Sequence, residues 1–160
     1  MNETFKCTLG IDTALKVSYQ QNTRTEQEPP RNFAEPTKTT TRTVTATVLN
    51  NHQFDIHSLV VRDAIPLADD DAKVKIMLRK PEGLARAKDD EEVSVEVGCD
   101  ATDIRIRWMK IVNGKGGEKD GMFEWVCGVP VGKEVKLEAE WDVKAAANLK
   151  WEEKTNDAKK

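Results

Sequence analysis

Residues 39–49, TTTRTVTATVL, form the stretch of this sequence that indicates its fold most strongly. Nearly all of them are β-branched, and such side chains favour the extended backbone of a strand. Threonines alternate here with Val44, Ala46 and Val48, so that one face of the strand is hydroxylated and the other is apolar. The segment therefore predicts a strand that buries one face and leaves the other face polar.

The same alternation recurs in short runs on both sides of this segment. The further strands that it predicts are residues 5–11, 15–19, 54–65, 72–78, 93–97, 104–108, 123–127 and 135–143. Turn residues separate the runs, and a helical pattern is limited to one turn at 83–87. About nine short strands without crossover helices are typical of an antiparallel sandwich. We expect an all-β protein, an immunoglobulin-like antiparallel β-sandwich.

The expected domain organisation is simple. A chain of 160 residues suffices for one domain with a real core, which we place at residues 1–151. Residues 20–38 are polar and contain Pro29, Pro30 and Pro36, so we expect a long polar loop there. Residues 152–160 are polar and predict a flexible tail.

Composition limits the classes of partner. The 25 basic and 28 acidic residues are mixed along the chain and give a net charge of −3, so nothing resembles the basic stripe that binds nucleic acid. No apolar run approaches the roughly 20 residues that cross a bilayer, and the first residues do not match a signal peptide. We expect no nucleic acid and no membrane as partners.

Three cysteines, Cys7, Cys99 and Cys127, form no close pair and no metal-ligand spacing. We expect reduced thiols of a cytoplasmic protein, with one disulfide and one free thiol as the alternative.

Residue types that carry catalysis are scarce and scattered. His52 and His57 are five residues apart, so on a strand they face opposite sides. The three serines lack the setting of a nucleophile elbow. Carboxylates cluster at residues 69–71 and 89–92, but they are consecutive and do not match a calcium loop. We predict no catalytic residue, no cofactor and no metal site.

The four tryptophans leave a choice open. Trp125 and Trp141 are in phase with the apolar faces of their strands, which favours the core. Trp108 and Trp151 are not fixed by the pattern, and if exposed they could stack on a sugar or a peptide.

Several phrases, taken in order, carry a resemblance to a known family. They are TLGID at 8–12, LKVSY at 15–19, VVRDAIP at 60–66, KIML at 75–78, PEGLA at 81–85 and GMFEWVC at 121–127. Over residues 4–151 the chain resembles the C-terminal domain of mucoidy-inhibitor-A-like proteins, a domain of unknown function common in fungi. The resemblance implies a β-sandwich at the end of a larger protein, with no established catalytic residues. It also implies that leading strands of the domain are missing, which would leave an open sheet edge.

These observations favour a non-enzymatic protein-interaction or self-association module whose partner is a second copy or another protein. We expect the edge at residues 39–47, where main-chain hydrogen bonds could hold a partner strand. A lectin-like glycan-binding protein is the first alternative. The second alternative is an unrecognised enzyme that uses Asp63 with Arg62 or His57.

Overall fold

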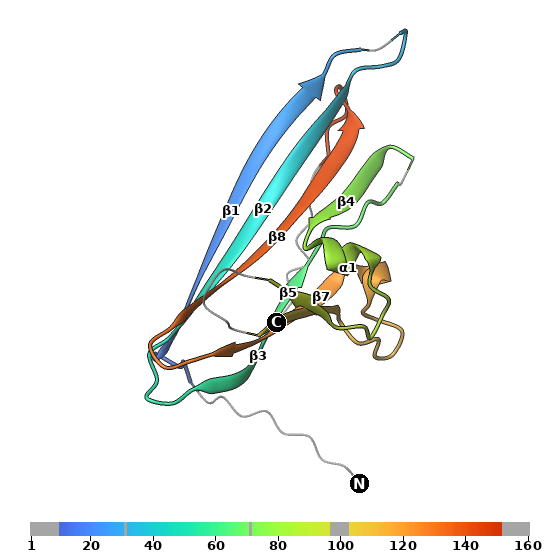
Figure 1. Ribbon diagram of the computed structural model, residues 1–160. Coiled ribbons are helices and arrows are strands. Elements are labelled where there is room, and N and C mark those ends of the chain that lie inside the picture. The colour runs from blue at the N-terminus through green and yellow to red at the C-terminus, as the bar shows by residue number, and fades with distance from the viewer. Residues whose placement is uncertain (1–9, 31, 71, 97–102, 152–160) are drawn as a thin grey trace.

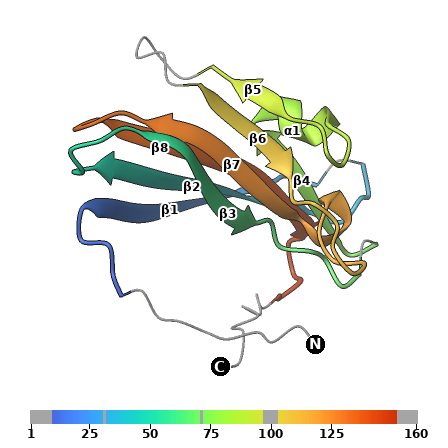
Figure 2. The same ribbon diagram turned by 90° about the horizontal axis from the view of Figure 1, so that it is seen from below.

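The computed structural model describes residues 10–30, 32–70, 72–96 and 103–151. Two antiparallel sheets of four strands pack face to face, with strand orders β1-β2-β8-β4 and β3-β7-β6-β5 (Figures 1 and 2). The strands of the first sheet are β1 (Leu15–Glu28), β2 (Thr37–Asn50), β8 (Glu134–Ala146) and β4 (Val74–Lys80). Those of the second are β3 (Ile56–Ala64), β7 (Met122–Val129), β6 (Ile104–Trp108) and β5 (Val93–Val95). The predicted sandwich is confirmed, with eight strands in the described part of the chain.

The core lies between the sheets and follows the alternation in the sequence. In β2 the even-numbered side chains from Val44 to Val48 are buried, and in the neighbouring β8 the odd-numbered ones from Val135 to Val143 lie beside them on the same inner face. The second sheet adds Phe123, Trp125 and Ile106. Each of these central strands therefore gives one face to the interior, as a half-buried sheet requires.

A short helix closes one open side of the sandwich. Helix α1 (Glu82–Arg86) lies between β4 and β5, and its Leu84 is fully buried in the core (Figure 1). Gly83 allows this close approach, because a Cβ built there would lie 2.3 Å from a methyl carbon of Val93. The predicted helical turn at 83–87 is thus present one residue earlier.

The prediction of a long loop at residues 20–38 is wrong, because most of this segment is strand. β1 continues to Glu28 and pairs with β2 without a break in register, so that Gln20 faces Thr45 and Glu28 faces Thr37. Only residues 29–36, which hold all three prolines, connect the two strands. Pairing with β2 orders this polar segment although it buries almost nothing itself.

The same pairing corrects the expected edge at residues 39–47. Strand β2 is hydrogen-bonded on both sides, to β1 and to β8, so it has no free edge. The expected tail at 152–160 lies outside the described residues, and so does most of the expected strand at 5–11.

The corner between the sheets is built on one buried amide. Asn50 ends β2, and its Nδ2 donates to the carbonyl oxygens of Phe54 and Val129, both at 2.9 Å. Its Oδ1 accepts from the backbone N–H of His52 at 2.9 Å. These contacts fix the turn that carries the chain from the first sheet to β3 in the second.

Candidate functional site

Strand β1 is the most exposed strand of the described chain. It lies at the end of the first sheet, and every residue after Leu15 is exposed (Figure 1). Val17 and Tyr19 lie on the inner face of the sheet, beside the buried Val48 and Ala46 of β2. Their side chains nevertheless remain 60% and 57% exposed. The second sheet thus leaves both faces of β1 accessible.

No described residue pairs with the backbone of β1 along its outer edge. The bonding pattern shows which residues of β1 point outward. The N–H and the C=O of Asn50 both bond toward β8, to Lys133 and Gly132, so the odd-numbered residues of β2 bond to β1. The odd-numbered residues of β2 are paired with even-numbered residues of β1, so the even-numbered residues of β1 bond to β2. The bond from the N–H of Asn51 to the carbonyl oxygen of Ala14 follows the same pattern. In an antiparallel ladder the intervening residues point the other way. The odd-numbered residues from Leu15 to Gln27 therefore direct their N–H and C=O groups outward.

The middle of this edge lacks the features that usually prevent strands from joining. Residues 17–23, VSYQQNT, contain no charge, no proline and no glycine, and the register to β2 has no bulge. Exposed edges in natural sheets usually carry charges, prolines or bulges that block pairing. A regular edge that is uncharged in its middle is a template for another strand.

The other three edges of the sandwich do carry such features. β3 has a register shift between Ile56 and Leu59, and β4 has one between Leu78 and Lys80. β4 is also rich in basic side chains, and β5 is only three residues long and lies beside α1. Among the described strands, β1 alone offers a long regular edge.

One polar contact links the inner face of β1 to the opposite sheet. The hydroxyl of Tyr19 donates to Oδ2 of Asp63 on β3 at 3.5 Å. Burial raises the pKa of Asp63 above its usual range, and it raises that of Tyr19 as well, with a further contribution from the Asp63 charge. This pair lies at the open side of the sandwich between β1 and β3.

A second candidate is a polar groove of about 500 Å³ on the outer face of the first sheet. Its lining consists of Asn22, Thr23, Arg24, Glu26, Glu28, Thr39, Thr41, Thr43, Arg79, Glu140 and Asp142. Its most buried carboxylate, Asp142, is already bound by Arg79 and by the hydroxyl of Thr41 at 2.8 Å. Glu140 accepts from Thr43 at 3.1 Å. Asp142 and Glu140 are thus satisfied within the sheet, and no group of three potential metal ligands gathers in the groove among the described residues.

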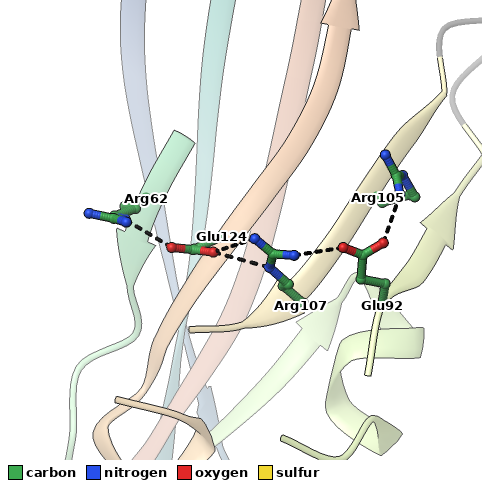
Figure 3. Close-up of polar contacts among 5 residues, drawn as sticks. All are labelled: Arg62, Glu92, Arg105, Arg107 and Glu124. Atoms are coloured by element: carbon green, nitrogen blue, oxygen red, sulfur yellow. Dashed lines mark hydrogen bonds and ion pairs between the residues drawn. The ribbon is translucent and has the colours of Figure 1, made fainter. Parts of the chain in front are cut away.

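The outer face of the second sheet carries a chain of ion pairs across β3, β7, β6 and the residue before β5 (Figure 3). Arg62 Nε lies 2.8 Å from one oxygen of Glu124, and Arg107 Nη2 lies 3.0 Å from the other. Glu92 then joins Arg107 to Arg105, both at 2.7 Å. Asp103, 3.3 Å from Arg105 Nε, supplies the third negative charge against the three arginines. This arrangement stabilises the sheet, and each of its members among the described residues already has a partner of opposite charge.

Glu124 is the buried member of this chain of ion pairs. Burial by itself raises its pKa, but the hydrogen bonds from Arg62 and Arg107 outweigh burial and hold the pKa below its usual value of 4.5. A carboxyl whose pKa is lowered by folding stabilises the native state above its unfolded pKa, and this stabilisation is lost as the pH falls through the folded pKa.

We therefore predict that Glu124→Gln lowers the free energy of unfolding by about 1–3 kcal/mol near pH 7. The difference from wild type should shrink as the pH falls below about 4.5, because the wild-type carboxyl then becomes neutral as well. Urea unfolding at a series of pH values measures this. A difference that stays constant down to about pH 3 would contradict the assignment.

The tryptophans proposed for ligand stacking do not form an open platform. Trp108 is only 4% exposed and belongs to the core, as do Trp125 and Trp141. Trp151 is partly buried against the core, and the ammonium of Lys38 lies 4.5 Å from the centre of its ring. Stacking on a ligand requires an exposed ring, and Trp108 is not exposed.

The residues considered for an enzyme do not converge. Asp63 faces the interior beside Tyr19, whereas Arg62 faces outward to Glu124. His52 is stacked on Phe54 and its Nε2 lies 2.8 Å from Asp12, which lowers the pKa of Asp12. His57 is exposed on β3.

Other predicted features have simple structural roles. Cys127 is a free thiol in the core, and burial raises its pKa to about 11, whereas Cys7 and Cys99 lie outside the described residues. Asp89 accepts from the N–H of Glu118 at 2.9 Å, and Asp70 accepts from that of Ala72. Within the described ranges, no three potential ligands gather at a metal site, and no helix could span a membrane.

Comparison with known proteins identifies no relative: no family model, no curated protein and no solved structure matches the chain. The resemblance to the mucoidy-inhibitor-A-like domain stays a prediction from the quoted phrases.

Proposed function

We propose that this domain is a non-enzymatic protein-interaction module that binds an extended partner strand along the free edge of β1. The observation that carries the proposal is the contrast among the four sheet edges, three of which are short, bulged or charged. Among the strands of the described residues, only β1 presents a long, regular and centrally uncharged row of backbone donors and acceptors. Strand addition uses such a row for affinity, while the side chains beside it give specificity.

The side chains along β1 suit this mode of binding. Val17 and Tyr19 lie exposed on the inner face, where alternate side chains of an added strand would meet them. Tyr19 is held toward β3 by its contact with Asp63, so the aromatic ring is partly ordered before a partner arrives. Binding to an ordered edge loses less conformational entropy than binding to a mobile segment.

The test is selection of binders from a displayed library of random ten-residue peptides, followed by hydrogen exchange on the domain with each resynthesised peptide. We expect bound peptides to protect the amides of the odd-numbered residues of β1, since these point outward. Binders that protect amides elsewhere, or a library that yields no binder, would contradict the proposal.

Two proline variants sharpen this experiment. The N–H of Gln21 points outward, so Gln21→Pro removes an edge donor and is expected to leave the β1–β2 ladder nearly intact. The N–H of Gln20 points to β2, so Gln20→Pro removes a ladder bond and should destabilise the domain. Gln21→Pro should abolish peptide binding while thermal unfolding stays close to that of wild type. Unchanged peptide binding by folded Gln21→Pro would contradict strand addition at this edge.

A further inference from the structure

We infer that the strand which β1 binds is β1 of a second copy of this chain, paired antiparallel about a twofold axis that passes beside Gln21. The inference rests on the proposed use of this edge and names its partner. The two first sheets would then join into one continuous sheet of eight strands, with the same patch contributed by each copy.

Backbone geometry restricts the registers that are available. Only odd-numbered residues of β1 point their N–H and C=O groups outward, so each must face an odd-numbered residue of the other copy. Outer-face side chains then meet outer-face side chains, which are the even-numbered residues from Lys16 to Glu28. The twofold axis can pass beside any residue in the middle of the strand.

Charge selects among these registers. With the axis beside Gln21, Lys16 of each copy faces Glu26 of the other, and Arg24 faces Ser18. Moving the axis to Gln20 would place Lys16 against Arg24 and bring like charges together twice.

Moving the axis to Asn22 would place Lys16 against Glu28. However, Glu28 already contacts Lys144 at 3.7 Å and the hydroxyl of Thr37 at 3.4 Å within its own chain. Glu26 has only the exposed contact with Arg24 on its own strand among the contacts of the described residues. Its carboxylate is thus the better partner for a lysine that arrives from outside.

The Gln21 register also keeps every outward backbone group paired from Leu15 to Gln27. On the inner face it places Val17 beside Thr25 and Tyr19 beside Thr23, and β-branched side chains pack well across antiparallel strands. The uncharged segment 17–23 lies at the centre of the pairing, and the charged pair lies toward both ends.

The test is sedimentation velocity on the full chain at low ionic strength, with Lys16→Glu, Glu26→Lys, the double variant and an equimolar mixture of the two single variants. We expect wild type to dimerise at micromolar concentration. Each single variant should dimerise at least tenfold more weakly, because two like-charge contacts replace two attractive ones. The double variant should recover, and so should the mixture, since both contacts are again complementary in a heterodimer.

Glu28→Lys is the matched control for register and should change the dimerisation constant by less than about threefold. Thermal unfolding confirms that all variants are folded, which is expected because the changed side chains are exposed. A strictly monomeric wild type, or a mixture that is no better than the single variants, would overturn the inference. Peptide binding at β1 would persist in that case if the proposed function is right, so the two failures are distinguishable.

Discussion

Replacing Phe123 with alanine is expected to lower the free energy of unfolding by about 3–5 kcal/mol, the largest effect we predict for any single side chain. Phe123 is fully buried at the start of β7, where it contacts Trp125 edge to face with ring centroids 6.2 Å apart. It faces Trp108 on one neighbouring strand and Asp63 on the other. Its removal would leave a cavity that two flanking β-strands cannot collapse into.

Phe33→Ala is the matched control, because this phenylalanine is fully exposed in the β1–β2 connection. Its removal should change stability by no more than about 0.5 kcal/mol. Urea unfolding monitored by tryptophan fluorescence measures both variants. Similar stabilities for the two alanine variants would mean that Phe123 does not lie in the core as described.

The second large effect is expected at Asn50. Asn50→Ala should lower the free energy of unfolding by about 2–4 kcal/mol, although it removes few atoms. The carbonyl oxygens of Phe54 and Val129 and the N–H of His52 would lose their partner, and Asn50 itself is fully buried. Buried polar groups without a partner are more costly than the loss of a hydrogen bond at the surface.

Asn51→Ala provides the comparison at the neighbouring position. The side chain of Asn51 is exposed, and its backbone N–H still donates to the carbonyl of Ala14 at 2.8 Å. Its stability should stay within about 0.5 kcal/mol of wild type. Equal losses at the two positions would show that the turn, rather than the buried amide, determines stability there.

The alternation of residues predicts most of the fold correctly. In β2 and β8 it identifies the buried face residue by residue, because one-sided burial forces a period of two. The placement of Trp125 and Trp141 in the core follows from the same phase. These strands are predictable because the alternation of apolar and polar residues within each strand shows which side faces the interior.

The second half of β1 could not be recognised in this way. Residues 20–28, QQNTRTEQE, are polar on both faces, because neither face is buried in the sandwich. Their strand conformation comes from hydrogen bonds to β2, a separate segment of the chain with a strong strand propensity of its own. The absence of glycine and proline between Leu15 and Glu28 is the one local signal that could have indicated a longer strand.

Because the second half of β1 was expected to be a loop, the free sheet edge was predicted at residues 39–47 instead of at β1. The threonine-rich segment reads as a good edge when it is considered alone, but it is the strand that β1 covers on one side and β8 on the other. Which strand lies at a sheet edge depends on pairing between distant segments, and alternation within one segment does not encode that pairing. Trp108 was undecided for a related reason, because it is the last residue of its strand, and its burial depends on the packing of the core between the two sheets.

Amide hydrogen exchange in β1 over a range of protein concentrations shows whether the outer edge of this strand accepts a second strand. The even-numbered amides from Lys16 to Gln20 should be protected at every concentration, because they bond to β2. The amides of Val17, Tyr19 and Gln21 should exchange rapidly in dilute solution and become protected as the concentration rises. Protection of these odd-numbered amides at high dilution, or rapid exchange at every concentration, would show that β1 does not pair with a second strand along its outer edge.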